Sequence, residues 1–315
     1  MTERPLRIAT RQSRLALWQA EHVAAQLRER HHDMEVVLVP MTTQGDRVLD
    51  RPLAQVGGKG LFIKELEMAI AEDRADIAVH SMKDVPSELP PGMTLAAMLP
   101  RADARDAFVS QRFADYQSLP QGARIGTSSL RRQSQLKALR PDLEILPLRG
   151  NVETRLRKLD EGHYDAIILA AAGLTRLGYI QRITQYMDVG QSLPAVGQGI
   201  VGIECRADDA RSVRLASALD DPTSRLCCEA ERAFALRLQG SCQSPIAGFA
   251  QLQGNELTLR GVVGSEDGKT IYRGTSTGTS PHAVGVELAE RLLSAGADVL
   301  LAAQRALSPD FGATQ

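Results

Sequence analysis

The feature that most constrains the fold is an alternation of strand-like and helix-like segments near the start of the chain. Apolar runs at 6–11, 34–41 and 76–82 predict strands, and helical patterns start at Ser13 and near residue 61. Ser13 is well suited to cap the first of these helices. Units of this kind favour a parallel or mixed sheet with helices on both faces.

The alternation starts again after Pro100, which predicts a second α/β unit. Its segments are strands at 123–129, 143–150 and 165–174, and helices at 129–139 and 152–162. The stretch 191–206 is then typical of a return crossing that ends in a further strand. It contains GQGIVG, but a strand-like and not a helical pattern follows, so we exclude a dinucleotide site.

The last hundred residues change character. A helix is predicted to begin at Pro222 and to end at Gly240. Three strands follow, with turns at 254–255 and 267–268, and then a helix that we expect to break near Gly296. These features predict a small α+β domain with a three-stranded antiparallel sheet.

The predicted fold class is therefore α/β, with two α/β domains and a small α+β C-terminal domain. We assign residues 1–100 with 195–218 to domain 1, which is discontinuous, 101–194 to domain 2 and 219–315 to domain 3. The Gly-rich stretch 47–60 is weakly patterned, and we expect it to form a mobile lid.

Composition excludes several classes of protein. The 315 residues carry a net charge of −1, whereas a general nucleic-acid binder should be basic. We find neither an apolar run near the ~18 residues that span a membrane nor a signal-peptide pattern, so we expect a cytoplasmic protein. The four cysteines lack zinc-ligand spacing and are too few for a disulfide framework, so we predict no metal site.

Arginines recur where predicted strands end and where the following helices begin. Ligands of open α/β sheets bind at the carboxyl ends of strands. An arginine in the first turn of a helix opposes the helix dipole unless an anion is also present, and guanidinium groups bind carboxylates and phosphates. The pattern predicts a cleft for a polyanionic ligand. The arginines are Arg11, Arg131, Arg132, Arg149, Arg155 and Arg176.

The segment HSMKDVP places Ser81, Lys83 and Asp84 at the end of another predicted strand. An aspartate beside a lysine is most often an ordinary surface pair. In a cleft rich in cations, however, Asp84 would stay ionised and could stabilise a cationic intermediate or shuttle a proton.

Cys242 lies in a predicted loop, GSCQSPIAG, between a helix and a strand. Three interpretations stay open: a half-buried structural thiol, a nucleophile, and a point of covalent attachment. The nearest histidine in sequence is His282, in another element, which weakens the nucleophile interpretation without excluding it.

Seven blocks carry more specific information: IATRQSRLALWQA, VGGKGLFIKELE, AVHSMKDVP, RIGTSSLRRQSQL, LRGNVETRLRKLDEGHYDAIILAAAGLTRLG, LPAVGQG and GSCQSPIAG. In this order they resemble the porphobilinogen deaminase family, also called hydroxymethylbilane synthases. The resemblance implies two domains related to periplasmic binding proteins and a third that carries the cysteine. It implies a monomeric transferase that joins four porphobilinogen molecules stepwise, losing ammonia at each step. Hydrolysis then releases linear hydroxymethylbilane, a precursor of haem.

The resemblance also implies roles for particular residues. A dipyrromethane cofactor would be attached to Cys242 by a thioether, and Asp84 would be the catalytic residue. Cofactor and substrate carboxylates would be bound by the six arginines together with Ser13, Lys59, Ser81, Lys83, Thr127 and Ser129. Two rival hypotheses are a non-enzymatic anion receptor of two α/β domains and a thiol-dependent transferase without a cofactor.

Overall fold

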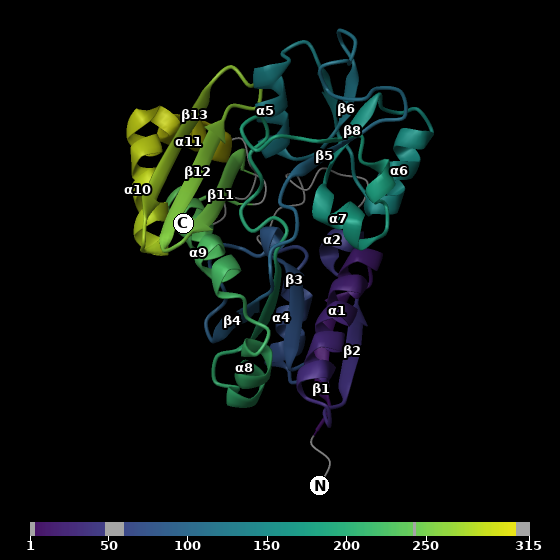
Figure 1. Ribbon diagram of the computed structural model, residues 1–315, viewed down its shortest axis with the longest axis vertical. Coiled ribbons are helices and arrows are strands. Elements are labelled where there is room, and N and C mark those ends of the chain that lie inside the picture. The colour runs from purple at the N-terminus through teal and green to yellow at the C-terminus, as the bar shows by residue number, and fades with distance from the viewer. Residues whose placement is uncertain (1–3, 48–59, 242–243, 307–315) are drawn as a thin grey trace.

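The computed structural model describes residues 4–47, 60–241 and 244–306. The predicted lid at 47–60 falls almost wholly outside these ranges, and so do Lys59 and Cys242. The described residues form three sheets, each with its own helices (Figure 1).

The first sheet has the strand order β2-β1-β3-β10-β4. β1 runs parallel to β2 and β3, whereas β10 runs antiparallel to β3 and β4. Its elements are β1 (Leu6–Arg11), α1 (Arg14–Arg30), β2 (Val36–Met41), α2 (Gln44–Arg47), α4 (Lys64–Ala71), β3 (Ile77–Ser81), the 3-10 turn η1 (Met82–Asp84), β4 (Met93–Met98), β10 (Val201–Arg206) and α8 (Ala210–Ser217).

The second sheet repeats this plan with the order β7-β6-β8-β5-β9, in which β5 is antiparallel to both neighbours. The chain passes into it after β4 and returns before β10, so each unit receives its inner antiparallel strand from a crossing segment. The elements are β5 (Asp106–Val109), β6 (Arg124–Gly126), α5 (Leu130–Leu139), β7 (Glu144–Leu146), α6 (Val152–Asp160), β8 (Ala166–Ala170), α7 (Ala171–Arg176), η2 (Ile180–Arg182) and β9 (Gln185–Tyr186).

The third sheet is the predicted antiparallel meander, with the order β11-β12-β13. The predicted break at Gly296 is confirmed, because this residue has φ 111° between two helices. The elements are α9 (Pro222–Arg237), β11 (Ile246–Gln253), β12 (Glu256–Gly264), β13 (Ile271–Gly278), α10 (Pro281–Leu292), the π-helical turn η3 (Leu293–Ala297) and α11 (Asp298–Ala306).

The predicted fold class is confirmed, but several element boundaries were wrong. The strand expected at 165–174 ends at Ala170, and helix α7 begins there, so Arg176 ends a helix and does not follow a strand directly. Helix α9 ends at Arg237, and Gln239, with φ 54°, takes the left-handed position expected of Gly240. Our domain division places the boundaries between domains 1 and 2 in the two crossing segments and the start of domain 3 between α8 and α9, and it remains a proposal.

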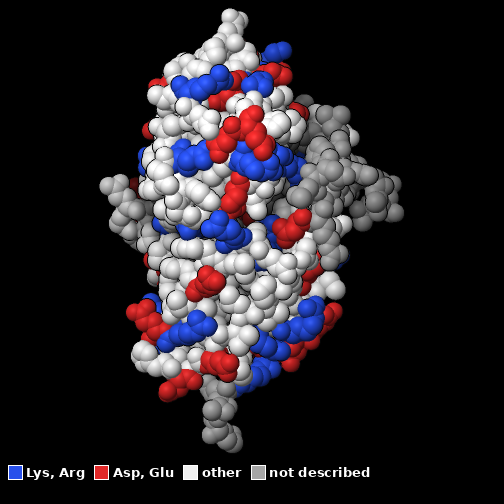
Figure 2. All heavy atoms as spheres, turned by 90° about the vertical axis from the view of Figure 1, so that its right-hand side faces the viewer, with Lys and Arg blue, Asp and Glu red and all other residues white. Residues whose placement is uncertain are grey.

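The outer face of the α/β units carries mixed charge. Figure 2 shows positive and negative side chains interspersed on the side that it draws. Around α6, Arg182 pairs with Asp160 at 2.6 Å and Arg157 with Glu161 at 2.5 Å. Such exposed pairs stabilise the fold by only about 0–1 kcal/mol each. They do, however, keep single-sign areas from spreading over this face.

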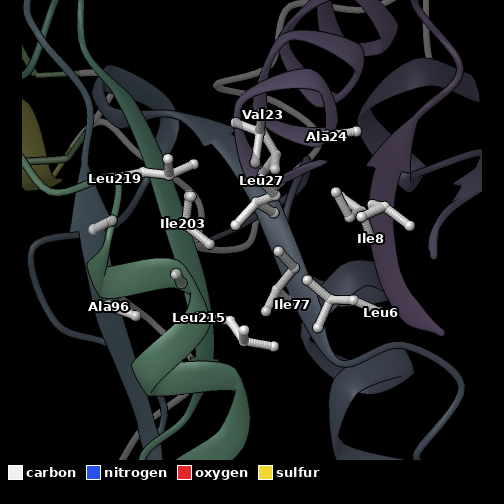
Figure 3. Packing of buried hydrophobic residues seen from close by; sticks show 14 of the residues in the cluster. Leu6, Ile8, Val23, Ala24, Leu27, Ile77, Ala96, Ile203, Leu215 and Leu219 are labelled. Carbon is white, nitrogen blue, oxygen red and sulfur yellow. The ribbon is translucent and has the colours of Figure 1, made fainter. Parts of the chain in front are cut away.

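Each α/β sheet is buried between helices on its two faces. On one face of the first sheet, Val23 and Leu27 of α1 pack with Ile8, Ile77 and Leu215 in one cluster (Figure 3). Helix α4 packs on the opposite face. With both faces covered, the polar end of the sheet where the parallel strands stop is the place left for a site.

The glycines of GQGIVG have a structural role in the return crossing. Gly197 and Gly199 have φ of 70° and 89°, which disfavours other residues. A Cβ on Gly202 would lie 2.2 Å from the sulfur of Met82, and one on Gly197 would lie 2.8 Å from the Met82 Cβ. The crossing therefore packs closely against the η1 turn, which also contains Asp84.

The third domain is fixed to both crossing segments by one buried carboxylate. Glu231 of α9 is fully buried and accepts hydrogen bonds from Gly197 N (2.7 Å), Arg101 Nη2 (2.8 Å) and Ala250 N (2.8 Å). Arg101 lies in the segment between β4 and β5, and Gly197 lies in the segment that returns to β10. Glu231 thus connects the third domain to both segments that join the α/β units.

We predict that Glu231→Gln lowers the free energy of unfolding by about 3–5 kcal/mol, because it leaves the Arg101 guanidinium buried without its counter-ion. Urea unfolding followed by circular dichroism measures the change. Glu229→Gln is the matched control, since Glu229 lies on the same helix in an exposed 3.6 Å pair with Arg225. A Glu231→Gln protein as stable as the control would contradict the prediction.

Candidate functional site

The site is built where parallel strands of both α/β units end. Arg11 is the last residue of β1, and Ser81 is the last residue of β3. Lys83 and Asp84 follow directly in the η1 turn. In the second unit, Thr127 follows β6, so the predicted residues do lie at strand ends.

Hydroxyl groups cap the helices that follow these strands. Ser13 accepts a hydrogen bond from Ala16 N (3.3 Å) at the start of α1, and Ser129 accepts one from Arg132 N (3.4 Å) at the start of α5. Thr127 Oγ1 accepts a bond from Ser129 N at 3.2 Å. In each case the hydroxyl acts as an acceptor and donates to no group among the described residues, so its O–H can donate to an anion.

Ser81 is tied to the core of the first unit. Its hydroxyl accepts a 2.8 Å hydrogen bond from Nε2 of Gln19, a buried residue of α1. Sequence reasoning missed Gln19, because a glutamine inside a helix carries no signal of its partner 62 residues away. Among the described contacts, the Ser81 hydroxyl is bonded to the Gln19 amide and to no charged group.

Positive charge from the two units converges around Lys83 and Asp84. The pKa of Lys83 is lowered to about 8, mainly by burial and in part by the charges of Arg132 and Arg155, while Asp84 opposes the shift. Burial likewise lowers the pKa of Arg155 to about 10, and the charges of Arg132, Arg149 and Arg11 act in the same direction. The structure thus brings together residues that the sequence separates by more than a hundred positions.

Asp84 is the carboxylate at the centre of this positive charge. It is half-buried, and its charge acts on both Lys83 and Arg155. No hydrogen bond or ion pair to its side chain occurs within residues 4–47, 60–241 and 244–306. Its oxygens can therefore accept hydrogen bonds from a bound molecule.

Arg11 is oriented by two residues that sequence analysis missed. Asp46 accepts hydrogen bonds from Nη2 and, at 3.1 Å, from Nε, and the Phe62 ring centre lies 4.1 Å from the guanidinium carbon. Thr43 Oγ1 in turn donates to Asp46 at 2.7 Å. Among the described residues Nη1 of Arg11 has no hydrogen-bond partner, so it can donate to a ligand.

Arg131 and Arg132 are both buried and share one carboxylate, Asp106, which sequence analysis also missed. Arg131 donates to Asp106 through Nη1 (2.8 Å) and Nη2 (3.1 Å). Arg132 donates to it through Nη2 (2.8 Å) and Nε (3.1 Å). These two arginines are therefore part of a buried ion cluster before any ligand arrives.

The remaining predicted arginines lie in the second unit. Arg176 donates to the carbonyl of Gly199 at 2.7 Å and lies over the Trp18 ring, with 5.7 Å to the ring centre. Burial lowers its pKa to about 10. Arg149 is half-buried after β7, and its charge acts on Arg155. Arg176 thus links α7 to the return crossing and to α1.

Cys242 and Lys59 lie outside the described residues, so their placement stays a prediction. The two serines that flank the cysteine segment contact each other: Ser241 N donates to Ser244 Oγ and Ser244 N donates to Ser241 O, each at 3.0 Å. The three other cysteines are buried, and burial raises their thiol pKa, to about 11 for Cys205 and about 12 for Cys228. They are poorly suited to act as reactive thiolates.

The charge balance at the site fits an anionic group. The arginines Arg11, Arg131, Arg132, Arg149 and Arg155 and Lys83 face only three carboxylates among the described site residues, those of Asp46, Asp84 and Asp106. Burial lowers the pKa of Lys83 and of Arg155, and the charge of Arg132 acts on both in the same direction. Within the same residues, no group of three or more metal-ligating side chains could hold an ion.

The fold and site together define a two-unit α/β protein that gathers positive charge where the units meet, with a third domain fixed to the crossing segments. Residues 6–214 match the model for "Porphobilinogen deaminase, dipyromethane cofactor binding domain", and residues 225–294 match "Porphobilinogen deaminase, C-terminal domain". The chain belongs to the porphobilinogen deaminase family. Membership defines a hydroxymethylbilane synthase, a transferase that polymerises porphobilinogen on a dipyrromethane cofactor.

Several solved structures are similar to this chain at low sequence identity. A putative methionine-binding lipoprotein from Bacillus subtilis is 11% identical over 68% of this chain and 89% of its own, with a TM-score of 0.43. A periplasmic substrate-binding protein of an ABC transporter from Coxiella burnetii is 14% identical over 70% of this chain and 94% of its own, with a TM-score of 0.44. A nutrient-binding protein from Burkholderia cenocepacia, bound to methionine, is 13% identical over 74% and 96%, with a TM-score of 0.44.

The lowered pKa of Lys83 predicts a pH effect on catalysis. In the free enzyme Lys83 carries its charge below about pH 8 and loses it above. Because kcat/KM reports the free enzyme, it should fall above about pH 8 as the lysine stops attracting substrate carboxylates. In Lys83→Arg, whose guanidinium stays charged, this alkaline limb should move to higher pH.

The measurement is kcat/KM for porphobilinogen between pH 6 and 10 in both proteins, with Lys137→Arg as the control. Lys137 donates to the backbone carbonyls of Pro141 and Leu143 at the far end of α5 and to no other group among the described residues. If the alkaline limb stays at the same pH in Lys83→Arg, Lys83 is not the titrating group.

Proposed function

We propose that this protein builds hydroxymethylbilane at the site described above, with Asp84 as the catalytic residue and Cys242 as the attachment point of the dipyrromethane. Four porphobilinogen units are joined in turn, one ammonia leaves with each, and hydrolysis releases the linear product. The observation that carries the assignment is a carboxylate without a partner among the described residues, whose charge acts on half-buried cations of both α/β units, Lys83 and Arg155.

The cations match the substrate. Each porphobilinogen carries an acetate and a propionate, so a growing chain gathers negative charge with every unit. Arg11, Arg149, Arg155 and Lys83 are placed to pair with these carboxylates, and the hydroxyls of Ser13 and Ser129 to donate to them. Pairing is necessary because a buried carboxylate without a counter-ion costs several kcal/mol. Arg131, Arg132, Thr127, Ser81, Arg176 and Lys59 complete the set that we assign to binding.

Asp84 is suited to the chemical step. Loss of ammonia from porphobilinogen leaves a positively charged pyrrole derivative, and a nearby carboxylate lowers the energy of developing positive charge. The pyrrole N–H can donate to the same oxygens. The nearby cations bind the carboxylates of the substrate, whereas the negative charge of Asp84 stabilises the positive charge that develops on the pyrrole.

The dipyrromethane supplies the pyrrole carbon to which the first substrate is joined. A loop cysteine is suited to hold it, because a thioether needs a sulfur within reach and no turnover of the thiolate. The other three cysteines are buried, which leaves Cys242 as our candidate. By this assignment the third domain presents the sulfur to the site.

Two rival functions are weaker. A non-enzymatic anion receptor would use the same arginines but gains nothing from Asp84 or from a cysteine on a third domain. A thiol-dependent transferase without a cofactor would need a base near the sulfur. Family membership favours the deaminase over both.

The partner that we assign is porphobilinogen, and we expect a monomer that binds neither nucleic acid nor membranes. Mixed charge on the face in Figure 2 supports the absence of a nucleic-acid surface. Among the described helices none is long and apolar enough to cross a bilayer. A cytoplasmic location is proposed from the family alone.

We predict that the purified wild-type protein carries the mass of a dipyrromethane and that Cys242→Ala does not. Intact-protein mass spectrometry measures both, and Cys227→Ala is the control, since Cys227 is buried in the core of the third domain. Unmodified but fully active wild-type protein would exclude the cofactor model. An adduct that persists in Cys242→Ala would place the attachment elsewhere.

For Asp84→Ala we predict a native-like circular dichroism spectrum and a kcat lowered by about 100-fold or more, the usual contribution of a catalytic proton-transfer or charge-stabilising group. Glu88→Ala is the matched control, since Glu88 is exposed four residues further on. Turnover of Asp84→Ala at the rate of Glu88→Ala would remove Asp84 from the mechanism.

A further inference from the structure

Asp106 is a fully buried carboxylate at the start of β5, where the chain has just entered the second α/β unit. Besides Arg131 and Arg132, it accepts hydrogen bonds from Ser192 Oγ (2.9 Å) and Gln198 Nε2 (3.0 Å). The two guanidinium groups hold the pKa of Asp106 well below its usual range, against the effect of burial. Asp106 is therefore a permanent anion beneath two of the arginines assigned to binding.

The cluster also ties helix α5 to the return crossing. The carbonyl of Leu193 accepts bonds from Arg131 Nη1 (2.7 Å) and Gln135 Nε2 (3.1 Å), and Leu193 N donates to Gln135 Oε1 (2.8 Å). Gln198 donates in addition to the carbonyl of Ala104 in the other crossing segment (2.6 Å). The orientation of the arginines is thus set by both segments that join the α/β units.

The buried cluster carries one net positive charge, because it contains two guanidinium groups and one carboxylate. Arg132 also donates from Nη1 to the carbonyl of Ile168 at 2.9 Å, which fixes its plane. Arg132 further acts on the pKa of Lys83 and Arg155, so this remaining charge belongs to the electrostatics of the site.

We propose that Asp106 is a positioning residue for the transferase reaction: it fixes Arg131 and Arg132 and leaves them one net positive charge, which suits a single carboxylate of the anionic pyrrole chain. The inference rests on the proposed function. Without Asp106 the pair would carry two net charges, lose its common anchor and attract small anions in place of an ordered substrate carboxylate.

If Asp106 had only a structural role, its replacement would give a different experimental result. Breaking a buried ion cluster lowers stability in either case. A structural cluster, however, would leave the folded fraction with unchanged substrate binding and unchanged response to small anions. Binding of porphobilinogen and inhibition by inorganic sulfate therefore separate the two roles.

The test compares Asp106→Asn with Asp103→Asn. Asp103 lies in the same segment but pairs with Arg105 in a partly exposed pair. In Asp106→Asn we expect the KM for porphobilinogen to rise at least about 10-fold, and inhibition by sulfate to strengthen at least about 10-fold, which corresponds to about 1.4 kcal/mol for each. Asp103→Asn should stay within about two-fold of wild type for both, as an exposed pair contributes little.

Wild-type KM and wild-type sulfate inhibition in Asp106→Asn would overturn the proposal, whatever the melting temperature. Should Asp106→Asn fail to fold, Asp106→Glu decides: it keeps the charge and moves it by one methylene group. We then expect a raised KM with sulfate inhibition like that of wild type, and an unchanged KM would overturn the positioning role.

The mass of the wild-type protein is measured first, because it tests the proposed function independently of the role of Asp106. Absence of the dipyrromethane would refute the proposed function and this inference with it. A loaded wild-type enzyme beside an Asp106→Asn protein with unaltered kinetics would refute only the role of Asp106.

Discussion

The gathering of positive charge from both α/β units at the strand ends is the constraint on which the rest of this structure depends. Cations from two α/β units meet at the strand ends, and burial lowers the pKa of Lys83 and Arg155 well below the usual values. Such an arrangement is tolerable only with counter-ions. The protein supplies some of them, and an anionic ligand would supply the rest, so stability and ligand binding are linked at one place.

The three carboxylates at the site differ in their hydrogen-bond partners. Asp46 is engaged by Arg11 and Thr43, and Asp106 is engaged by two arginines, a serine and a glutamine. Both therefore act on side chains of the protein. Asp84 alone of the three has no such partner among the described residues, and it is the one that we assign to the substrate. The hydrogen-bond pattern thus distinguishes a carboxylate available for chemistry from two that position cations.

Much of the fold could be predicted because its signals are local. The N-cap Ser13, the turns of the meander and the break at Gly296 each depend on a few neighbouring residues. Helix α7 was missed because its residues continue the apolar pattern of β8, and periodicity alone does not separate a buried strand from a buried helix. Asp106, Glu231 and Gln19 were missed for another reason: their partners are distant in sequence, and a single buried polar residue has no periodic pattern.

These distant partners also explain why the third domain matters for the site. Glu231 bonds to both crossing segments, and Asp106 bonds to residues of the same return crossing within a few positions of Gly197. A change in the angle between the α/β units would have to move these segments, and hence strain both buried carboxylates together. Hydrogen bonds to buried charges are the strongest available in a protein interior, so they favour a few discrete arrangements over continuous bending. The position of the arginines and the attachment of the third domain are therefore coupled through the same two crossing segments.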